Sequence, residues 1–172
     1  MIVWLNGNFG AGKTTTARLL KDTLPARVFD SEHIGYLLRG IIDDVPCYDF
    51  KEWDPWRGLT IETARQVLDY VGGTLVIPQS VLQHEYWTEL TDGFTKARIP
   101  LRAFTLHTDP DTFRHRVEND ADEPTAKQWR LDHRPAYETA LDAWMRDATE
   151  VVDTTHRTPE QVAAHIKAAL NA

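Results

Sequence analysis

Cysteine is nearly absent from this chain, whose 172 residues include a single one, Cys47. One thiol cannot form an internal disulfide, so the fold requires no oxidising compartment. The aspartate and proline neighbours of Cys47 offer no cation that would activate it as a nucleophile. We therefore expect Cys47 to be a structural or incidental thiol rather than a catalytic one.

Long hydrophobic runs are also missing. No stretch approaches the ~20 apolar residues that a membrane-spanning helix needs. The apolar run at the N-terminus covers only Met1 to Leu5, and no basic stretch comes before it. We therefore expect no signal peptide and a cytoplasmic protein.

The chain has no excess of basic residues. Lys and Arg total 19 against 26 Asp and Glu, which gives a formal net charge of −7. Nucleic-acid binding relies on clustered Lys and Arg that displace counterions, so we expect no nucleic-acid partner. An anionic small molecule is not excluded, because one local basic pocket can outweigh a mildly acidic surface.

What is present is the composition of a globular protein. Hydrophobic residues make up 42% of the chain and charged residues 26%, which is typical of a folded chain rather than a disordered one. The length suits one domain that spans residues 1–172 and buries a core of its own.

Short apolar runs alternate with segments of helical periodicity. The predicted strands are residues 2–5, 27–30, 74–77, 101–106 and 150–153, and the predicted helices are residues 14–24, 31–42, 60–70, 85–96, 110–119, 127–147 (interrupted near Pro135) and 159–170. This alternation predicts an α/β fold with a five-stranded parallel sheet sandwiched by helices. All strands then end at one edge, where ligands bind in such folds.

The segment Gly7-Asn8-Phe9-Gly10-Ala11-Gly12-Lys13-Thr14 matches the phosphate-binding pattern G-x-x-x-x-G-K-[ST], between a predicted strand and a predicted helix. Its glycines let successive backbone N–H groups turn toward an anion, and the helix presents its positive end. Lys13 is expected to reach the β- and γ-phosphates, and Thr14 is expected to bind Mg²⁺. Thr15, the next residue, is also expected to contact the nucleotide. The segment predicts a P-loop NTPase that binds ATP with Mg²⁺, and the absence of an N-K-x-D element argues against a GTPase.

Asp30 stands at the end of the second predicted strand. A carboxylate there can accept the proton of an attacking hydroxyl or bind Mg²⁺ through water. Alternatively, Asp30 or Ser31 caps the helix that follows, and Glu32 is a second candidate base or a partner of the helix dipole. The spacing resembles that of small P-loop kinases of the nucleoside-monophosphate-kinase type, in which an acidic residue here faces the γ-phosphate and an arginine-bearing lid lies between strands four and five.

Arginines flank the polar loop at residues 120–124. They are Arg114, Arg116, Arg130 and Arg134. Their forked guanidinium groups suit the oxygens of a transferred phosphoryl group, so residues 114–134 are predicted to form a lid in which two or three of them close over ATP. The alternative is a solvated helix face with pairs such as Arg114–Glu118. After the fifth strand, Asp153 and Thr154 are predicted to pack against adenine.

Residues 43–58 are too aromatic for a spacer and lie where such kinases carry their acceptor-binding segment. Trp56 and Arg57 together are predicted to contact the acceptor, through stacking and anion pairing, whereas Phe50 or Trp53 alone fits core packing better. Further candidates for the acceptor pocket are His33, Tyr36 and Gln79.

Two signatures of other sites are missing. After the third strand the chain has Ile77-Pro78-Gln79-Ser80 where a Walker B carboxylate would stand. Mg²⁺ would then depend on Thr14, water and Asp30, which argues against a fast ATPase. The seven histidines show no H-x-x-H pair on one helix, so we predict no zinc site.

A closer resemblance is carried by residues 2–14, by Phe29-Asp30-Ser31-Glu32-His33-Ile34-Gly35, by Trp56-Arg57, by Val76-Ile77-Pro78 and by His84-Glu85-Tyr86. These segments look like the tunicamycin-resistance protein family, to about Leu106 and more loosely beyond. The resemblance implies an ATP-binding protein that confers resistance to a nucleoside antibiotic mimicking a UDP-sugar. Members have been described as membrane-associated through a C-terminal amphipathic segment, but this chain ends soon after residues 159–170, which argues against that property here.

The loop also resembles chloramphenicol phosphotransferases and the zeta toxins, which phosphorylate UDP-N-acetylglucosamine. We therefore expect an ATP-dependent phosphotransferase acting on a hydroxyl of a nucleoside-type antibiotic such as tunicamycin, with Asp30 as base. Lys13 and the lid arginines would stabilise charge. The alternatives are ATP-gated sequestration of the antibiotic without chemistry, which the missing Walker B residue favours, and a toxin-like kinase of a nucleotide sugar.

Overall fold

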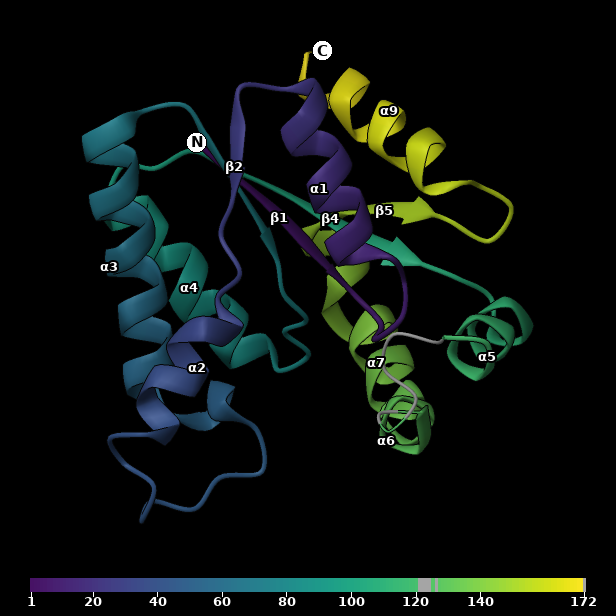
Figure 1. Ribbon diagram of the computed structural model, residues 1–172, viewed down its shortest axis with the longest axis horizontal. Helices are drawn as coiled ribbons and strands as arrows, with labels where there is room; N and C mark the ends of the chain where they lie inside the picture. The colour runs from purple at the N-terminus through teal and green to yellow at the C-terminus, as the bar shows by residue number, and fades with distance from the viewer. Residues whose placement is uncertain (121–124, 126, 172) are drawn as a thin grey trace.

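The structure is a computed structural model that describes residues 1–120, 125 and 127–171. Its strands are β1 (Ile2–Gly7), β2 (Ala26–Val28), β3 (Thr74–Pro78), β4 (Leu101–His107) and β5 (Glu150–Asp153). They form one sheet in the order β2-β3-β1-β4-β5, and every neighbouring pair is parallel. The predicted five-stranded parallel sheet is therefore confirmed (Figure 1).

Helices connect the strands. They are α1 (Lys13–Thr23), α2 (Glu32–Arg39), the 3₁₀ turn η1 (Phe50–Glu52), α3 (Asp54–Val71), α4 (His84–Lys96), α5 (Pro110–Glu118), α6 (Lys127–Asp132), α7 (Arg134–Ala140), the π-helical turn η3 (Leu141–Met145), α8 (Arg146–Ala148) and α9 (Pro159–Leu170). Within the described part of the chain, no helix combines the length and apolar character needed to cross a bilayer.

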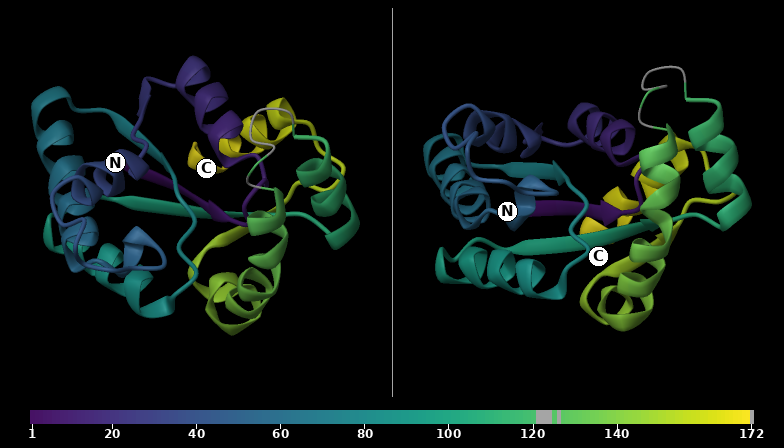
Figure 2. Two further views of the ribbon diagram at one scale, coloured as in Figure 1. Left: turned by 60° about the horizontal axis from the view of Figure 1, so that its bottom comes forward. Right: turned by 90° about the horizontal axis from the view of Figure 1, so that it is seen from below.

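Strand β1 shows why both faces of the sheet are covered. Successive side chains of a strand point to opposite faces, and every residue of β1 is buried. Val3 and Leu5 belong to the core cluster beneath α1 and α9, whereas Ile2 and Trp4 belong to the cluster that α3, α4 and α7 cover. Figure 2 shows this sandwich from two further sides.

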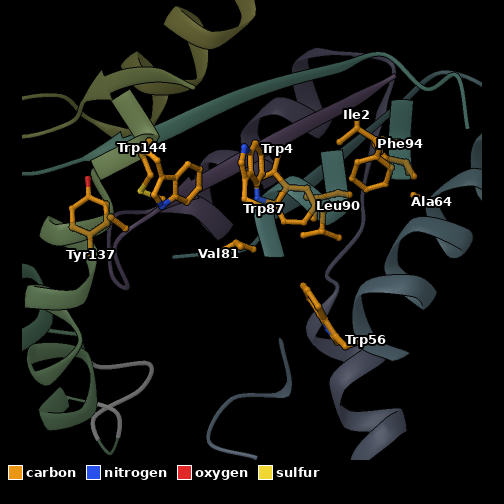
Figure 3. Packing of buried hydrophobic residues seen from close by; sticks show 14 of the residues in the cluster. Ile2, Trp4, Trp56, Ala64, Val81, Trp87, Leu90, Phe94, Tyr137 and Trp144 are labelled. Atoms are coloured by element: carbon orange, nitrogen blue, oxygen red, sulfur yellow. The ribbon is translucent and has the colours of Figure 1, made fainter. Parts of the chain in front are cut away.

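Tryptophan rings dominate the second cluster. The ring centroids of Trp4 and Trp87 lie 5.6 Å apart, and those of Trp87 and Trp144 lie 5.8 Å apart. Figure 3 shows these rings together below the sheet, joining β1, α4 and η3. Each buried indole removes roughly 150–250 Å² from water, so this contact holds the helices after α6 against the sheet.

Most predicted boundaries differ from the observed ones by one or two residues, and two helices differ by more. Helix α2 ends at Arg39 rather than at Ile42, with Gly40 as its C-cap. Helix α3 begins at Asp54, earlier than the predicted residue 60, because Pro55 occupies its first turn, where proline is favoured. The predicted break near Pro135 is confirmed, since α6 and α7 divide at His133.

Candidate active site

The loop between β1 and α1 has the backbone conformation that an anion-binding turn requires. Gly12 precedes α1 with φ 88° and ψ 19°, in the left-handed region that side chains disfavour. The first N–H groups of α1 have no intrahelical partners and carry the positive end of the helix dipole. At the start of the loop, a Cβ on Gly7 would lie 2.3 Å from the carbonyl oxygen of Leu106 in β4.

Lys13 bends back over this loop. Its Nζ donates to the carbonyl of Asn8 at 2.7 Å and of Gly7 at 3.3 Å. Burial lowers the pKa of Lys13 to about 7, with Lys51 and Arg130 adding to the effect and Glu32 opposing it. A phosphate placed in the loop would restore the preference for the charged ammonium.

The sheet edge beside the loop is tied together by Asn6, which the sequence analysis missed. Asn6 is fully buried, and its Oδ1 accepts hydrogen bonds from the N–H groups of Gly7 and Val81 at 2.9 and 3.0 Å. The hydroxyl of Ser80 also donates to the Gly7 carbonyl at 2.7 Å. The segment after β3 is thereby held against the start of the phosphate loop. In the sequence, this role of Asn6 is indicated only by its position as a polar residue at the end of an apolar strand.

A cavity of about 430 Å³ opens where β1, β2 and β3 end. We call it the strand-end cavity. Its lining residues are Phe9, Gly10, Lys13, Thr14, Arg18, Asp30, Glu32, Tyr36, Pro78, Gln79, Ser80, Trp129 and Arg130. The predicted base, the predicted Mg²⁺ ligand and two predicted acceptor residues are therefore brought together. Arg18 was not predicted, although it lies one helical turn after Thr14 and so on the same side of α1.

Asp30 stands before Ser31, the N-cap residue of α2, and it both binds the first turn of that helix and lines this cavity. Its Oδ1 accepts a hydrogen bond of 3.0 Å from the backbone N–H of Glu32 at the start of α2. The other oxygen, Oδ2, makes no hydrogen bond with the residues that the structure describes. The phenol of Tyr36 donates to Glu32 Oε2 at 3.1 Å, whereas His33 is exposed and lies outside the cavity lining.

A second cavity, the loop-side cavity, has a volume of about 760 Å³ and shares Lys13 and Thr14 with the first. Its lining residues are Gly10, Gly12, Lys13, Thr14, Thr15, Arg18, His115, Arg116, Asn119, Asp120 and Arg130. It places two of the four predicted lid arginines beside the phosphate loop. Arg130 also pairs with Asp120 at 2.5 Å. The rest of the predicted 120–124 loop lies outside the described residues.

The other two lid arginines are not at the loop. Arg114 is exposed on α5 and lines neither cavity. Arg134 is 8% exposed, donates to Glu138 at 2.7 Å, and holds its guanidinium 5.0 Å from the ring centroid of Phe113. The prediction that Arg134 closes over ATP is therefore corrected: the residue is at the start of α7 and packs against Phe113 of α5.

A small pocket of about 150 Å³ lies between the loop and α9. Its lining residues are Gly10, Ala11, Gly12, Thr16, Arg116, Thr154, Arg157, Pro159 and Val162. Arg116 donates to the Thr154 carbonyl at 2.7 Å and to its hydroxyl at 3.2 Å. Thr154 therefore lines a pocket beside the phosphate loop, whereas Asp153 is exposed and its carboxylate accepts a hydrogen bond from the N–H of Thr155.

Trp56 and Arg57 require the clearest correction. Trp56 is fully buried and its indole N–H donates to the Ser31 carbonyl at 2.9 Å. Arg57 is 5% exposed and donates to Glu89, to Asp54 and to a backbone carbonyl. Both residues join α3 to its neighbours, so they are packing residues rather than acceptor contacts.

The 43–58 segment nevertheless reaches the site through other residues. A cavity of about 230 Å³, which we call the clasp cavity, lies between the 43–58 segment and helices α6 and α7. Its lining residues are Phe9, Tyr48, Asp49, Lys51, Glu52, Leu82, Gln83, Asp132, His133 and Ala136. The rings of Tyr48 and His133 stack with centroids 5.8 Å apart, and Phe9 of the phosphate loop lines both this and the strand-end cavity.

Solved structures resemble the whole chain. The tunicamycin resistance protein of Deinococcus radiodurans is 25% identical with a TM-score of 0.73, over 99% of this chain and 95% of that one. A sugar kinase from a Janibacter species has 21% identity and a TM-score of 0.68, over 99% and 94% of the two chains. The APS kinase of Mycobacterium tuberculosis, in complex with AMPPNP and APS, has 17% identity and a TM-score of 0.64, over 99% and 97%. No curated protein sequence matches.

The similarity to a tunicamycin resistance protein confirms the resemblance predicted from the sequence motifs. The two kinases share the fold with this chain, as expected for a parallel sheet whose first strand leads into a phosphate loop. A family model described as AAA domain matches residues 2–133, which are most of the chain. The protein therefore belongs to the AAA domain family and has a P-loop kinase-like fold.

Proposed function

We propose that this protein is an ATP-dependent phosphotransferase that phosphorylates a hydroxyl of a nucleoside-type antibiotic such as tunicamycin, and so confers resistance. The observation that carries the proposal is the strand-end cavity. Lys13 and Thr14 of the phosphate loop and Asp30 all line this cavity, whose volume is about 430 Å³. The similarity over almost all of both chains to a tunicamycin resistance protein supports the choice of acceptor.

In the proposed reaction the acceptor's hydroxyl oxygen forms a bond to the γ-phosphorus. The bond from that phosphorus to the β–γ bridging oxygen breaks, and ADP leaves. Asp30 takes the hydroxyl proton, through the oxygen that does not cap α2. Lys13 and Arg130 stabilise the negative charge on the phosphoryl oxygens, since both line the cavity.

The residues present fit a magnesium-bound triphosphate. Gly10 and Gly12 leave the loop open for phosphate oxygens, because both have positive φ and no side chain. Thr14 is exposed at the first turn of α1, where its hydroxyl can bind a cation. Mg²⁺ supplies charge neutralisation of the phosphates when bound, and Asp30 would hold it through water because no carboxylate follows β3.

Mass spectrometry of tunicamycin incubated with the protein, ATP and Mg²⁺ tests the proposal. We expect a mass increase of one phosphoryl group, absent with Lys13→Ala. A panel of nucleoside and amphenicol antibiotics extends the search for the acceptor. If no member gains phosphate while Mg²⁺-ATP binds in calorimetry, the phosphotransferase proposal is overturned.

One observation favours a second candidate, ATP-gated sequestration without chemistry. The residue after β3 is Gln79 rather than an acid, and it is 2% exposed. Sequestration predicts that Asp30→Asn keeps full resistance in cells while Lys13→Ala abolishes it. The phosphotransferase proposal predicts that both variants lose resistance, so the pair separates the two candidates.

A further inference from the structure

The two halves of the strand-end cavity carry opposite charge. Its cationic residues, Lys13, Arg18 and Arg130, belong to the phosphate loop, to α1 and to α6. Its acidic residues, Asp30 and Glu32, stand at the start of α2, next to Tyr36. The cations therefore lie on the side that suits a triphosphate, and the carboxylates lie on the side left for the acceptor.

The clasp cavity, which shares Phe9 with the strand-end cavity, adds further acidic residues to the site. Three carboxylates line it, those of Asp49, Glu52 and Asp132, together with one lysine, Lys51. Lys51 is 5% exposed and its ammonium is 2.5 Å from Asp49. This pair offsets one of the three carboxylates, and those of Glu52 and Asp132 remain to give the lining a net negative charge among the described residues.

Arg57 does not change this balance. It was the residue that could have recognised an anionic acceptor, yet its guanidinium is buried and donates to Glu89 at 2.5 Å and to the Lys51 carbonyl at 2.6 Å. It lines neither cavity. The acceptor side of the site therefore keeps a net negative charge among the described residues.

A buried amide oxygen provides an independent observation. Gln79 lines the strand-end cavity, is 2% exposed, and its side-chain Oε1 has no hydrogen-bond partner among the described residues. Buried polar atoms are rarely left unpaired unless a ligand or water completes them. An unpaired carbonyl oxygen calls for a donor, and hydroxyl groups supply one.

Aromatic rings complete the lining. Phe9 and Tyr36 line the strand-end cavity, and Phe9 and Tyr48 line the clasp cavity. Aromatic faces bind the C–H faces of sugar rings, while carboxylates and amide oxygens accept from sugar hydroxyls. The combination suits a ring that carries several hydroxyl groups and no charge.

We propose that the part of the acceptor lying against Asp30, Glu32 and Gln79 is an uncharged, polyhydroxylated sugar-like group, and that the site rejects acceptors that carry a phosphate or carboxylate there. This inference rests on the proposed phosphotransferase function and adds the chemical class of its substrate. Like charges brought together at a binding site repel each other, so discrimination of about 100-fold against the anionic acceptors is expected.

Acceptor-dependent ADP release with matched pairs tests the inference. The pairs are uridine and UMP, N-acetylglucosamine and its 6-phosphate, and glucose and glucuronate, with tunicamycin as a further uncharged acceptor. We expect kcat/KM to favour the uncharged member about 100-fold. Equal or better use of the anionic members overturns the inference and leaves the phosphotransferase proposal standing. If no acceptor stimulates ADP release although Mg²⁺-ATP binds, the phosphotransferase proposal fails, and the inference with it.

Two variants separate recognition from general damage. Glu52→Lys reverses a charge in the clasp cavity, and we expect it to reduce the preference for uncharged acceptors about tenfold. The control Asp147→Lys, on exposed α8 and outside both cavities, should leave the preference unchanged. An unchanged preference in Glu52→Lys would count against the inference.

Gln79→Leu removes the unpaired oxygen, and Gln79→Glu keeps an oxygen but adds charge. We expect Gln79→Leu to lower kcat/KM for the uncharged acceptors at least tenfold, because a site built to bind a hydroxyl depends on that partner. The affinity for Mg²⁺-ATP should stay within about threefold in Gln79→Leu, whereas Gln79→Glu, which places a carboxylate directly after β3, should alter it. If Gln79→Leu uses every acceptor as well as the wild type does, the assigned role of Gln79 is wrong.

Discussion

The Asp30 carboxylate accepts a hydrogen bond of 3.0 Å from the backbone N–H of Glu32 while it lines the cavity beside the phosphate loop. A helix cap and a catalytic base were alternatives when only the sequence was considered. In the structure Oδ1 accepts the hydrogen bond from α2, and Oδ2 makes no hydrogen bond with the described residues. The two roles are therefore compatible in one side chain.

Asp30→Asn separates these roles. Asparagine retains an oxygen that can cap α2, so the free energy of unfolding should stay within ~0.5 kcal/mol. Its amide cannot accept the hydroxyl proton as a base, so kcat should fall by about 10²- to 10⁴-fold. Urea unfolding and acceptor-dependent ADP release measure the two effects. Asp30→Ala, which loses the cap as well, should also cost ~1 kcal/mol of stability. Unaltered turnover in Asp30→Asn would contradict the assignment.

The affinity for Mg²⁺-ATP should fall as the pH rises above 7. Burial lowers the pKa of Lys13 to about 7, so free Lys13 loses its proton as the pH rises through that value. The triphosphate binds the charged form better, so binding takes up a proton, and the affinity falls by up to about tenfold per pH unit. Calorimetry between pH 6 and 9, in two buffers of different ionisation enthalpy, measures both effects.

Lys13→Arg is the control for this pH dependence, because a guanidinium stays charged throughout the range. Whatever affinity this variant retains should be nearly independent of pH. A wild-type affinity that stays flat between pH 7 and 9 would show that Lys13 keeps its proton in the free protein.

Arg57→Ala should reduce stability rather than acceptor recognition. Its buried guanidinium holds Glu89 and a backbone carbonyl, and hydrogen bonds to charged groups contribute ~1.5–3 kcal/mol. Because Glu89 is half-exposed, we expect a loss of about 1–2 kcal/mol in the free energy of unfolding. Arg65→Ala, at an exposed ion pair on the same helix, should change the free energy of unfolding much less. A raised acceptor KM with unchanged stability in Arg57→Ala would restore its predicted substrate role.

Gly7→Ala should disrupt both the sheet and the phosphate loop. The added Cβ would lie 2.3 Å from the Leu106 carbonyl oxygen, and Gly7 has φ 128°. We expect a loss of more than ~3 kcal/mol in the free energy of unfolding and loss of ATP binding. Gly58→Ala is the matched control, because Gly58 lies in α3 with open space around it and should gain ~0.5–1 kcal/mol. Thermal unfolding of both variants, with and without ATP, provides the comparison.

Arg130→Lys should lower kcat by about 10- to 100-fold, because lysine cannot reproduce a forked contact with phosphoryl oxygens. Arg114→Lys should remain within about twofold of the wild type, since Arg114 is exposed and lines neither cavity. Steady-state kinetics with saturating ATP gives both values. Equal losses in the two variants would indicate that the helices rearrange further when ATP binds.

The fold and the phosphate loop were predictable from short stretches of the sequence. Short apolar runs predict buried strands because a strand covered on both faces has no polar face. The loop at Gly7 and Lys13 was predictable because its chemistry needs particular residues at fixed spacing. Asp30 was predictable as well, since parallel strands bring their carboxyl ends to one edge.

Roles that depend on packing were not predictable in the same way. Trp56 and Arg57 have the chemistry of ligand contacts, but α2 and α4 pack over them in the folded chain. Arg130 and Arg134 are four residues apart, yet the break between α6 and α7 directs one to the loop and the other to Phe113.

The sequence by itself determined the order of strands and helices, the phosphate loop and the position of Asp30, because each depends on neighbouring residues. Only the tertiary structure decided which charged side chains remain available to a ligand. Arg57 and Arg134 are buried and form ion pairs within the protein. Gln79 is also buried, but its side-chain oxygen has no hydrogen-bond partner among the described residues. These outcomes depend on contacts between segments far apart in the chain. The contacts decide which polar groups are desolvated and which are paired, and a local sequence pattern does not indicate them.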